Sequence, residues 1–403
     1  MAKLFKGVPP FWQCPSPKCK GEKFGVLGIH DQSYTRRCND CDFDQTFQLP
    51  QPRKKILYLD QFAISLLVKV SLGRTPKADK WVKLRETIDR AIKAQAIICP
   101  HSELHERESW FDHKLGAELA KFYRRISLGR SFRSSFEIQS AQIHDALRTF
   151  EQDSTSCRWP RWHYFLRKDP DVWHDLIFMN VNTDKSREKA LAKQAKVELT
   201  SSAAELTMYF RQSNKTFDEQ YRLEVRQQAT NIVQIWTRQM RKMAACQTSQ
   251  EWVEAHLFGS IYSDTMNQIM RFYGQRGLAG EIMAERMKDF LFSSTFEEID
   301  VVRLAAALWA GIARKVFLKE GGVRASDSND VEMISHYAPY CDAMLVDRRM
   351  KGLLTTNPVK NKIGLETKFF SAIDLDELIA YLNELINQVP TEVAAKAKEV
   401  YGP

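Results

Sequence analysis

Short apolar runs alternate with helical patterns in two parts of the chain that lie far apart. In the first part, the run 56–59 ends at Asp60, and residues 62–68 follow with apolar positions at helical spacing. A second apolar run, residues 94–99, precedes Ser102, which can cap another helix. Strand, helix, strand, helix is the order of a parallel sheet, whose binding sites form beyond the carboxyl ends of the strands.

The same alternation resumes near the carboxyl end of the chain. A helical pattern is followed by a Gly-Gly break, and Ser328 or Asn329 then caps a helix that places Asp330 in its first turn. The pattern therefore predicts a second half of the same α/β domain. Its expected elements are helix 299–317, a helix through Ser335, strand 343–346, strand 368–372 and helix 375–386.

The two halves are separated by a long segment, residues 111–293, which is far too long for a loop without structure. Long helical patterns with few glycines or prolines run through it. We expect a helical subdomain inserted into the α/β domain. The predicted helices are 185–210, 217–245, 252–274 and 279–292.

Four cysteines mark the amino-terminal segment. Cys14 and Cys19 form one pair, and Cys38 and Cys41 form a second pair eighteen residues later, which is the spacing of a four-thiolate zinc site. Strand patterns at 24–28, 34–37 and 43–49 accompany them, and the arrangement resembles a zinc ribbon. A Zn²⁺ ion with four protein ligands has no open position, so the predicted zinc is structural.

Composition and charge narrow the class of partner. The chain has 403 residues, 44% of them hydrophobic, and a formal charge of +9 that suits a polyanion such as nucleic acid. No apolar run approaches the roughly 18 to 20 residues that span a bilayer, and the start has no apolar signal core. We expect a cytoplasmic protein with no membrane segment.

Acidic residues stand where the predicted strands end or the following helices begin. Asp60, Glu106, Asp330 and Asp347 are brought together by the expected topology. Like charges packed together disfavour ionisation unless a positive group neutralises them. Mg²⁺ prefers oxygen ligands and keeps several waters, so a few carboxylates at strand ends suffice to bind it.

The motifs Leu59-Asp60, Pro100-x5-Glu106, Asn329-Asp330 and Leu345-Val346-Asp347 resemble the acidic positions of PIN-domain nucleases. The resemblance covers residues 56–110 and roughly 294–390. It implies a three-layer α/β/α sandwich around a mostly parallel sheet. It also implies one or two Mg²⁺ or Mn²⁺ ions, and cleavage of phosphodiesters, RNA more often than DNA.

The chain departs from that family at two places and offers accessory candidates. Leu345 stands where the family usually has Thr or Ser, and Gln61-Phe62 replaces a commoner small polar residue. Glu103 substitutes for Glu106 if the helix register differs by one turn. Asp342 is either a further ligand or a capping group. His105 either packs near the carboxylates or touches the scissile phosphate.

Basic residues interleaved with aromatic ones are candidates for nucleic-acid binding, because they can contact phosphates and stack on bases. The alternative is that the aromatic residues only form the ribbon core or anchor the insertion. The candidates are Arg36 and Arg37 on the ribbon, and Arg158, Arg161, Arg167 and Lys168 in the insertion.

The sequence thus predicts a metal-dependent nuclease, most simply an endoribonuclease, and by analogy a toxin or defence enzyme. The alternative is a catalytically inactive protein of the same fold that binds nucleic acid or acts as a scaffold. A homo-oligomer or a regulatory protein partner is compatible with either. The expected organisation is a zinc ribbon (1–50), a first PIN-like half (51–110), a helical insertion (111–293), a second PIN-like half (294–390) and a tail (391–403).

Overall fold

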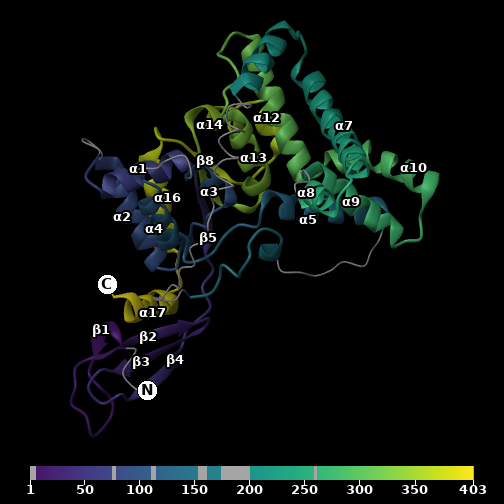
Figure 1. The fold of residues 1–403 in the computed structure, drawn as a ribbon. Helices are drawn as coiled ribbons and strands as arrows, with labels where there is room; N and C mark the ends of the chain where they lie inside the picture. The colour runs from purple at the N-terminus through teal and green to yellow at the C-terminus, as the bar shows by residue number, and fades with distance from the viewer. Residues whose placement is uncertain are drawn as a thin grey trace.

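The computed structural model describes residues 6–74, 79–109, 115–152, 161–173, 200–257 and 261–402. Figure 1 shows a small amino-terminal sheet at one end, a mixed α/β body in the middle and a group of helices on the far side. Arg158 and most of the predicted helix 185–210 lie outside the described residues. The described part of that prediction, residues 200–210, is helical, and the helix continues to residue 212.

The amino-terminal sheet has four antiparallel strands in the order β1-β2-β3-β4. Side chains on β3 alternate between buried and half-buried, which is the pattern of a strand with one covered face. Three of the strands were predicted, and β1, which contains two prolines, was not. The strands are β1 (Val8–Trp12), β2 (Phe24–His30), β3 (Ser33–Cys38) and β4 (Asp44–Gln48).

Helix α17 (Thr391–Tyr401) covers this sheet, with Val393, Ala397 and Val400 packed into one apolar cluster with Val26 and Tyr34. In Figure 1 the helix lies between the sheet and the α/β body. The prediction of a tail at 391–403 was therefore wrong for nearly all of these residues. Isolated helices of this length are only marginally stable in water, so the contact between the apolar faces of helix and sheet stabilises α17.

The α/β body is built on a parallel sheet in the order β6-β5-β7-β8. The strand β5 is central, and its Leu57 and Leu59 pair with Ala343 and Leu345 of β7. Mixed α/β structure with a parallel sheet is thus confirmed. The strands are β5 (Lys55–Leu59), β6 (Ile97–Ile98), β7 (Ala343–Leu345) and β8 (Lys368–Phe370).

Helices cover both faces of this sheet. Leu57 and Leu59 belong to an apolar cluster with α1, α2, α4 and α16, whereas Ile56 and Tyr58 belong to one with α12, α13, α14 and α15. Alternate residues of β5 therefore face opposite helical layers. The bounds are α1 (Gln61–Ser71), α2 (Asp79–Lys93), α4 (Gly116–Ser127), α16 (Leu375–Asn387), α12 (Asp300–Phe317), α13 (Asp327–Tyr337), α14 (Arg348–Leu354) and α15 (Val359–Ile363).

Helices α5, α7, α9, α10 and α11 form a further apolar core, and α7 packs along α12. Thr216 and Glu219 form a capping box at the start of α7. Because α4 packs on the sheet, the helical part begins after α4 and not at residue 111. No described helix is long and apolar enough to cross a membrane. The bounds are α3 (Glu103–Ser109), α5 (Ser135–Phe150), α7 (Phe217–Ala244), α8 (Ser249–Leu257), α9 (Ile261–Gly274), α10 (Gly280–Leu291), α11 (Ser294–Glu297), and the 3₁₀ turns η1 (Arg161–Tyr164) and η2 (Ala338–Tyr340).

Candidate functional site

Two of the predicted acids follow neighbouring strands. Asp60 directly follows β5, and its backbone N–H donates to the carbonyl of Leu345 at the end of β7 (3.0 Å). Asp347 lies two residues beyond Leu345. The strand order reverses between β5 and β7, because the chain continues from β5 to β6 on one side and reaches β7 on the other. The carboxyl edge at such a reversal is where ligands of open α/β sheets bind.

Each of these two carboxylates also begins a helix. Asp60 Oδ1 accepts the backbone N–H of Gln61 at 2.6 Å, at the start of α1. Asp347 Oδ1 accepts the backbone N–H of Met350 at 2.6 Å, at the start of α14. Both side chains are half-buried. The caps fix the two acids at the edge, because the capping bond holds the side chain over the first turn of its helix.

A salt bridge joins the start of α13, the helix that carries Asp330, to the start of α14. Arg349, the second residue of α14, donates to both oxygens of Asp327 at 2.7 and 2.8 Å, and to the carbonyl of Gly322 at 3.1 Å. Asp327 begins α13 and is fully buried, and Asp330 lies one turn further along that helix at 9% exposure. The predicted cap at Ser328 or Asn329 was wrong, since α13 starts at Asp327.

The structure distinguishes between Glu103 and Glu106. Glu103 Oε1 accepts the backbone N–H of Ser135 at the start of α5 (3.2 Å), so this side chain supports the neighbouring helix. Glu106 lies one turn further on, with its side chain 42% exposed and one oxygen 3.6 Å from His101 Nε2. Both belong to α3, which follows β6, the strand next to β5.

Among the described residues, the four cysteines are the one group of three or more possible metal-ligating side chains (His, Cys, Asp or Glu) whose ligand atoms all lie within 4.8 Å of one another. Asp60 and Asp347 follow strands that are hydrogen-bonded to each other, and Asp330 lies on α13, which is joined to α14 by the Asp327–Arg349 salt bridge. Glu106 lies on α3, after β6, the strand next to β5. The four acids do not form so tight a group. Cation binding by these four acids remains a prediction.

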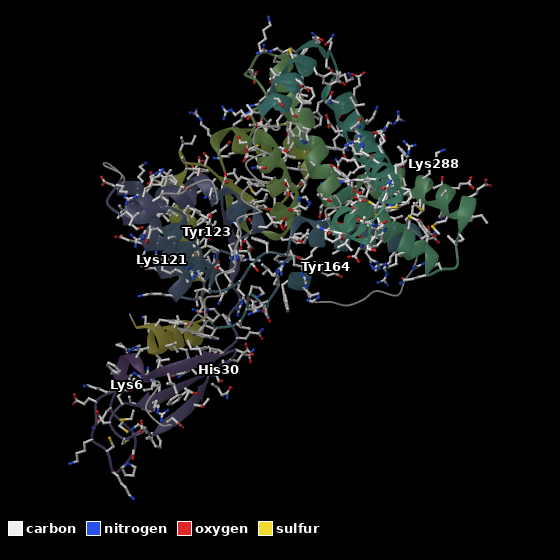
Figure 2. All side chains as sticks on the ribbon, in the orientation of Figure 1. Lys6, His30, Lys121, Tyr123, Tyr164 and Lys288 are labelled. Atoms are coloured by element: carbon white, nitrogen blue, oxygen red, sulfur yellow. The ribbon has the colours of Figure 1, made fainter. Side chains whose placement is uncertain are left out.

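His105 is a structural residue. Its ring stacks on Tyr58, with centroids 4.8 Å apart, and the tilted ring of Tyr123 lies 5.1 Å away. Tyr123 is labelled in Figure 2. Its Nδ1 accepts the backbone N–H of Ser102 (3.1 Å), and its Nε2–H therefore donates to the carbonyl of Leu59 (2.8 Å). Burial lowers the pKa of His105 to about 3. With 2% exposure it cannot reach a phosphate, so that part of the prediction was wrong.

Asp342 lies at the opposite edge of the sheet. It precedes β7, accepts the backbone N–H of Ile56 at 2.8 Å, and forms an ion pair with Lys55 at 2.8 Å. In a parallel sheet the amino ends of the strands are one strand length away from the carboxyl ends. Asp342 is thus the capping group of the two alternatives, and not a ligand shared with Asp347.

The predicted nucleic-acid contact at Arg36 was also wrong. Its guanidinium is buried, lies 3.4 Å from the ring centre of Trp12, and donates to the carbonyls of Pro10, Phe24 and Glu399. The side chain has 0% exposure, so a phosphate cannot reach it. Burial lowers the pKa of Arg36 from its ordinary value.

Arg37, Arg167 and Lys168 are partly accessible. Arg37 pairs with Asp42 at 3.5 Å, and Arg167 pairs with Glu137 at 3.1 Å while its side chain stays 58% exposed. Lys168 is exposed. The backbone of Arg161 belongs to η1. Contact of these residues with nucleic acid remains a prediction.

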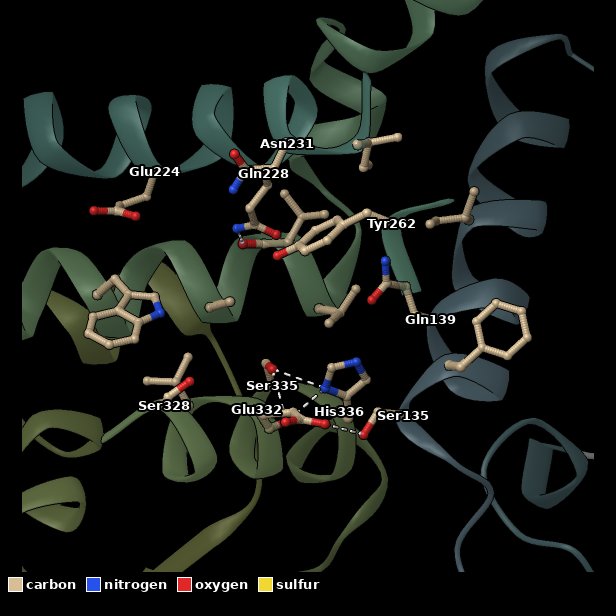
Figure 3. A pocket seen from close by; sticks show the side chains of 18 of the residues that line it. Ser135, Gln139, Glu224, Gln228, Asn231, Tyr262, Ser328, Glu332, Ser335 and His336 are labelled. Carbon is tan, nitrogen blue, oxygen red and sulfur yellow. Dashed lines mark hydrogen bonds between the residues drawn. The ribbon is translucent and has the colours of Figure 1, made fainter. Parts of the chain in front are cut away.

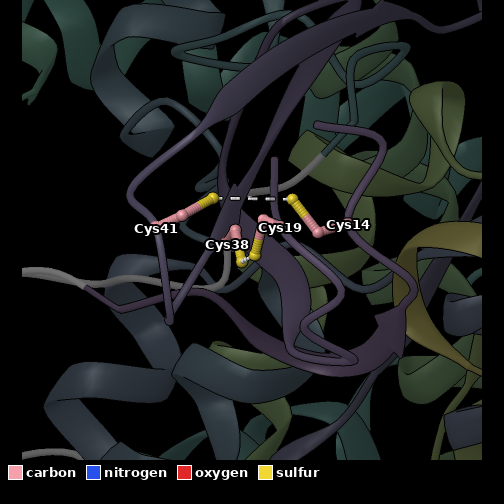
Figure 4. A group of neighbouring side chains, drawn as sticks. All are labelled: Cys14, Cys19, Cys38 and Cys41. Carbon is pink, nitrogen blue, oxygen red and sulfur yellow. Dashed lines mark hydrogen bonds between the residues drawn. The ribbon is translucent and has the colours of Figure 1, made fainter. Parts of the chain in front are cut away.

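The four cysteines meet in the amino-terminal sheet (Figure 4). The sulfurs of Cys14 and Cys41 are 3.6 Å apart, and those of Cys19 and Cys38 are 3.8 Å apart. A tetrahedral zinc with bonds of about 2.3 Å separates its sulfurs by about 3.8 Å. Both cysteine distances are far beyond the length of about 2.05 Å for a disulfide. Backbone N–H groups of Gly21 and Asp40 donate to two of the sulfurs, as expected for thiolates.

A cleft of about 790 Å³ lies between α13 and the helical part (Figure 3). One face of α7 and one face of α13 form its walls, and α5, α9 and α12 complete it. Neither its position nor its lining was predicted. Four of the α7 residues that line it are polar and share one helical face, and in the sequence such a face resembles a solvated surface. They are Glu224, Gln227, Gln228 and Asn231.

Comparison of the chain with protein-family models, curated proteins and solved structures finds no match. The arguments on function therefore depend on the geometry of the chain itself.

Proposed function

We propose that the α/β body is a metal-dependent nuclease that hydrolyses phosphodiester bonds, in RNA more readily than in DNA. The observation that carries the proposal is the placement of Asp60 and Asp347 after adjacent parallel strands at the reversal of strand order. The doubly covered parallel sheet and the helix start that carries Asp330 also fit the PIN-like fold that the motifs resemble.

In this proposal Asp60, Asp330, Asp347 and Glu106 hold Mg²⁺ or Mn²⁺, directly or through water. Such a bound ion lowers the pKa of water, orients it for in-line attack and offsets charge on the leaving oxygen. Mg²⁺ keeps several of its waters, so the acids need not gather as closely as the four cysteines do. Capping bonds to Asp60 and Asp347 hold both side chains in place before substrate arrives.

Arg348 is a candidate contact for the substrate. It directly follows Asp347, is exposed, and forms no salt bridge with any residue in the described ranges. A guanidinium beside the carboxylates can bind a backbone phosphate and orient it toward the metal. We expect Arg348→Ala to raise KM for RNA more than it lowers kcat.

We further infer that Cys14, Cys19, Cys38 and Cys41 bind one structural Zn²⁺, because their sulfur separations match tetrahedral coordination. Zinc analysis of the purified protein tests this inference separately from the nuclease. One equivalent per chain that falls to near zero in Cys38→Ser supports it, and a metal-free wild-type protein refutes it.

The nuclease proposal is tested by incubating labelled RNA and DNA with the protein under Mn²⁺, Mg²⁺ or EDTA. Asp60→Asn and Asp347→Asn are compared with Asp289→Asn, an exposed carboxylate on α10 that controls for the same chemical change. Loss of at least about a hundredfold in rate with the first two variants, and none with the third, is expected. Equal cleavage by all variants, or cleavage that EDTA leaves intact, would overturn the assignment.

The alternative of an inactive nucleic-acid-binding protein has one observation in its favour. Leu345, where a Thr or Ser would face the site, is fully buried in β7. RNA binding in a gel-shift assay without cleavage under any of the metals would establish this alternative and refute the enzyme.

A further inference from the structure

We propose that the cleft between α7 and α13 binds an extended organic polycation, such as a linear polyamine. This inference is independent of the nuclease. The cleft lies where two apolar cores meet, and its volume of about 790 Å³ falls within the range of small-ligand sites.

The charges that line the cleft carry one sign. Glu103, Glu224, Asp264 and Glu332 all line it, and none of its described lining residues is Lys or Arg. The whole chain has an excess of nine basic residues, so the composition of this cleft is opposite to that of the protein. A polyanion is repelled from such a space, whereas a cation is concentrated in it.

A buried amide points to a ligand that donates hydrogen bonds. Gln139 is 9% exposed, and its Nε2 donates to Thr265 at 3.1 Å. Its amide oxygen accepts no hydrogen bond from the described residues, and Figure 3 shows the amide group projecting from α5 between Tyr262 and His336. That oxygen is open to the cleft, so a ligand there can donate a hydrogen bond to it in place of water. An ammonium group in the cleft would supply that donor.

The arrangement of the carboxylates distinguishes a polycation from a metal ion. No three acidic groups of the cleft gather their oxygens within 4.8 Å, as far as the described residues show. Carboxylates that are spread along a cleft, instead of gathered at one point, suit a ligand with several ammonium groups joined by a flexible apolar chain. Trp309 and Tyr262 add half-buried aromatic rings, whose faces attract ammonium groups.

Glu224 is the carboxylate best suited to test the proposal. It is half-buried on α7, and its one hydrogen bond among the described residues comes from Gln220 Nε2 at 2.6 Å. Burial raises the pKa of Glu224, because no cation of the protein offsets the desolvation of its charge. A bound ammonium group would offset it. Substitution by Gln retains the shape and removes the charge.

The experiment is calorimetric titration of the full-length protein with spermidine at low salt, followed by hexa-arginine and Mg²⁺. We expect saturable binding of one spermidine per chain. Glu224→Gln should weaken it by roughly tenfold or more, which is about 1.4 kcal/mol or more, because the ammonium group loses a charged hydrogen-bond partner. Gln227→Lys, which adds a positive charge at the exposed edge of the cleft, should weaken it at least as much.

Glu281→Gln on α10 is the matched control, because it removes an equal charge from an exposed position outside the cleft. Binding that is absent, or that falls equally in the control, would overturn the proposal. Stronger binding of Mg²⁺ than of spermidine at the same residues would do so as well. Tighter binding of hexa-arginine with the same sensitivity to the variants would support the cationic ligand and assign it to a basic peptide.

Discussion

Acidification should destabilise the protein through His105. The neutral ring accepts the N–H of Ser102 and donates to the carbonyl of Leu59, so the protonated ring would lose the first bond and bury a charge. The pKa of His105 is about 3 in the folded chain and about 6.5 when it unfolds. Between these values the unfolded chain binds a proton that the native chain does not. Stability is therefore lost as the pH falls from 6.5 toward 3.

The size of the effect follows from the two pKa values. At pH 5 the proton on the unfolded chain favours unfolding by about 2 kcal/mol relative to pH 7.5 or above. We expect the wild-type protein to lose about this amount through His105, in addition to losses at other groups. His105→Gln offers an amide that can make both hydrogen bonds and does not titrate. It should be less stable at pH 7.5, where the ring stacking is lost, and should lack this pH-dependent loss.

Urea unfolding followed by tryptophan fluorescence at pH 7.5 and pH 5 measures both quantities. The difference in unfolding free energy between wild type and His105→Gln should shrink by about 2 kcal/mol on going to pH 5. All other titrating groups are common to both proteins, so they cancel. A difference that stays constant, or grows, would show that His105 is not held neutral by its surroundings.

Three further substitutions test the packing. Arg36→Ala should destabilise the ribbon by about 3 to 5 kcal/mol, because it removes a buried cation and leaves its carbonyl partners without a donor. Its control, Arg37→Ala, removes one residue of a half-exposed ion pair and should lower stability by about 1 kcal/mol or less, as measured by thermal unfolding. Gly311→Ala should lower the free energy of unfolding, measured in urea, by about 1 to 3 kcal/mol, because its methyl group would lie 2.6 Å from a methyl group of the buried Val359. Gly352→Ala is the control: its methyl group would meet nothing within 4 Å, so the change should be neutral or stabilising. Lys54 is buried, which lowers its pKa to about 7, so stability should rise by about 2 kcal/mol between pH 7 and pH 9 and should not rise in Lys54→Met. Equal effects in either matched pair, or an unchanged pH profile in Lys54→Met, would contradict the packing described above.

Sequence patterns correctly indicated those features that depend on residues close together in the sequence. The strand that ends before Asp60 and the one that ends before Asp347 were visible as apolar runs, and parallel connectivity puts their carboxyl ends at one edge. The cysteine pairs were visible for the same reason, since each pair lies on one tight turn.

Features that depend on distant partners could not be predicted in this way. Arg36 has the sequence context of an exposed basic residue, and it is buried by contacts with Trp12 and with α17 from the other end of the chain. The start of α13 depends on Asp327 meeting Arg349 of another helix. The cleft forms where polar faces of α7 and α13 come together, and in the sequence each of these faces resembles an ordinary solvent-exposed helix surface.

The position of α17 has a consequence for the order of events during synthesis. The sheet that carries the cysteines is made first, yet Val26 and Tyr34 remain uncovered until α17 has left the ribosome. At about 5 to 20 residues per second, that delay lasts on the order of tens of seconds. Throughout this interval the nascent chain displays an apolar sheet face that a chaperone could shield, and early metal capture would keep the strands paired meanwhile.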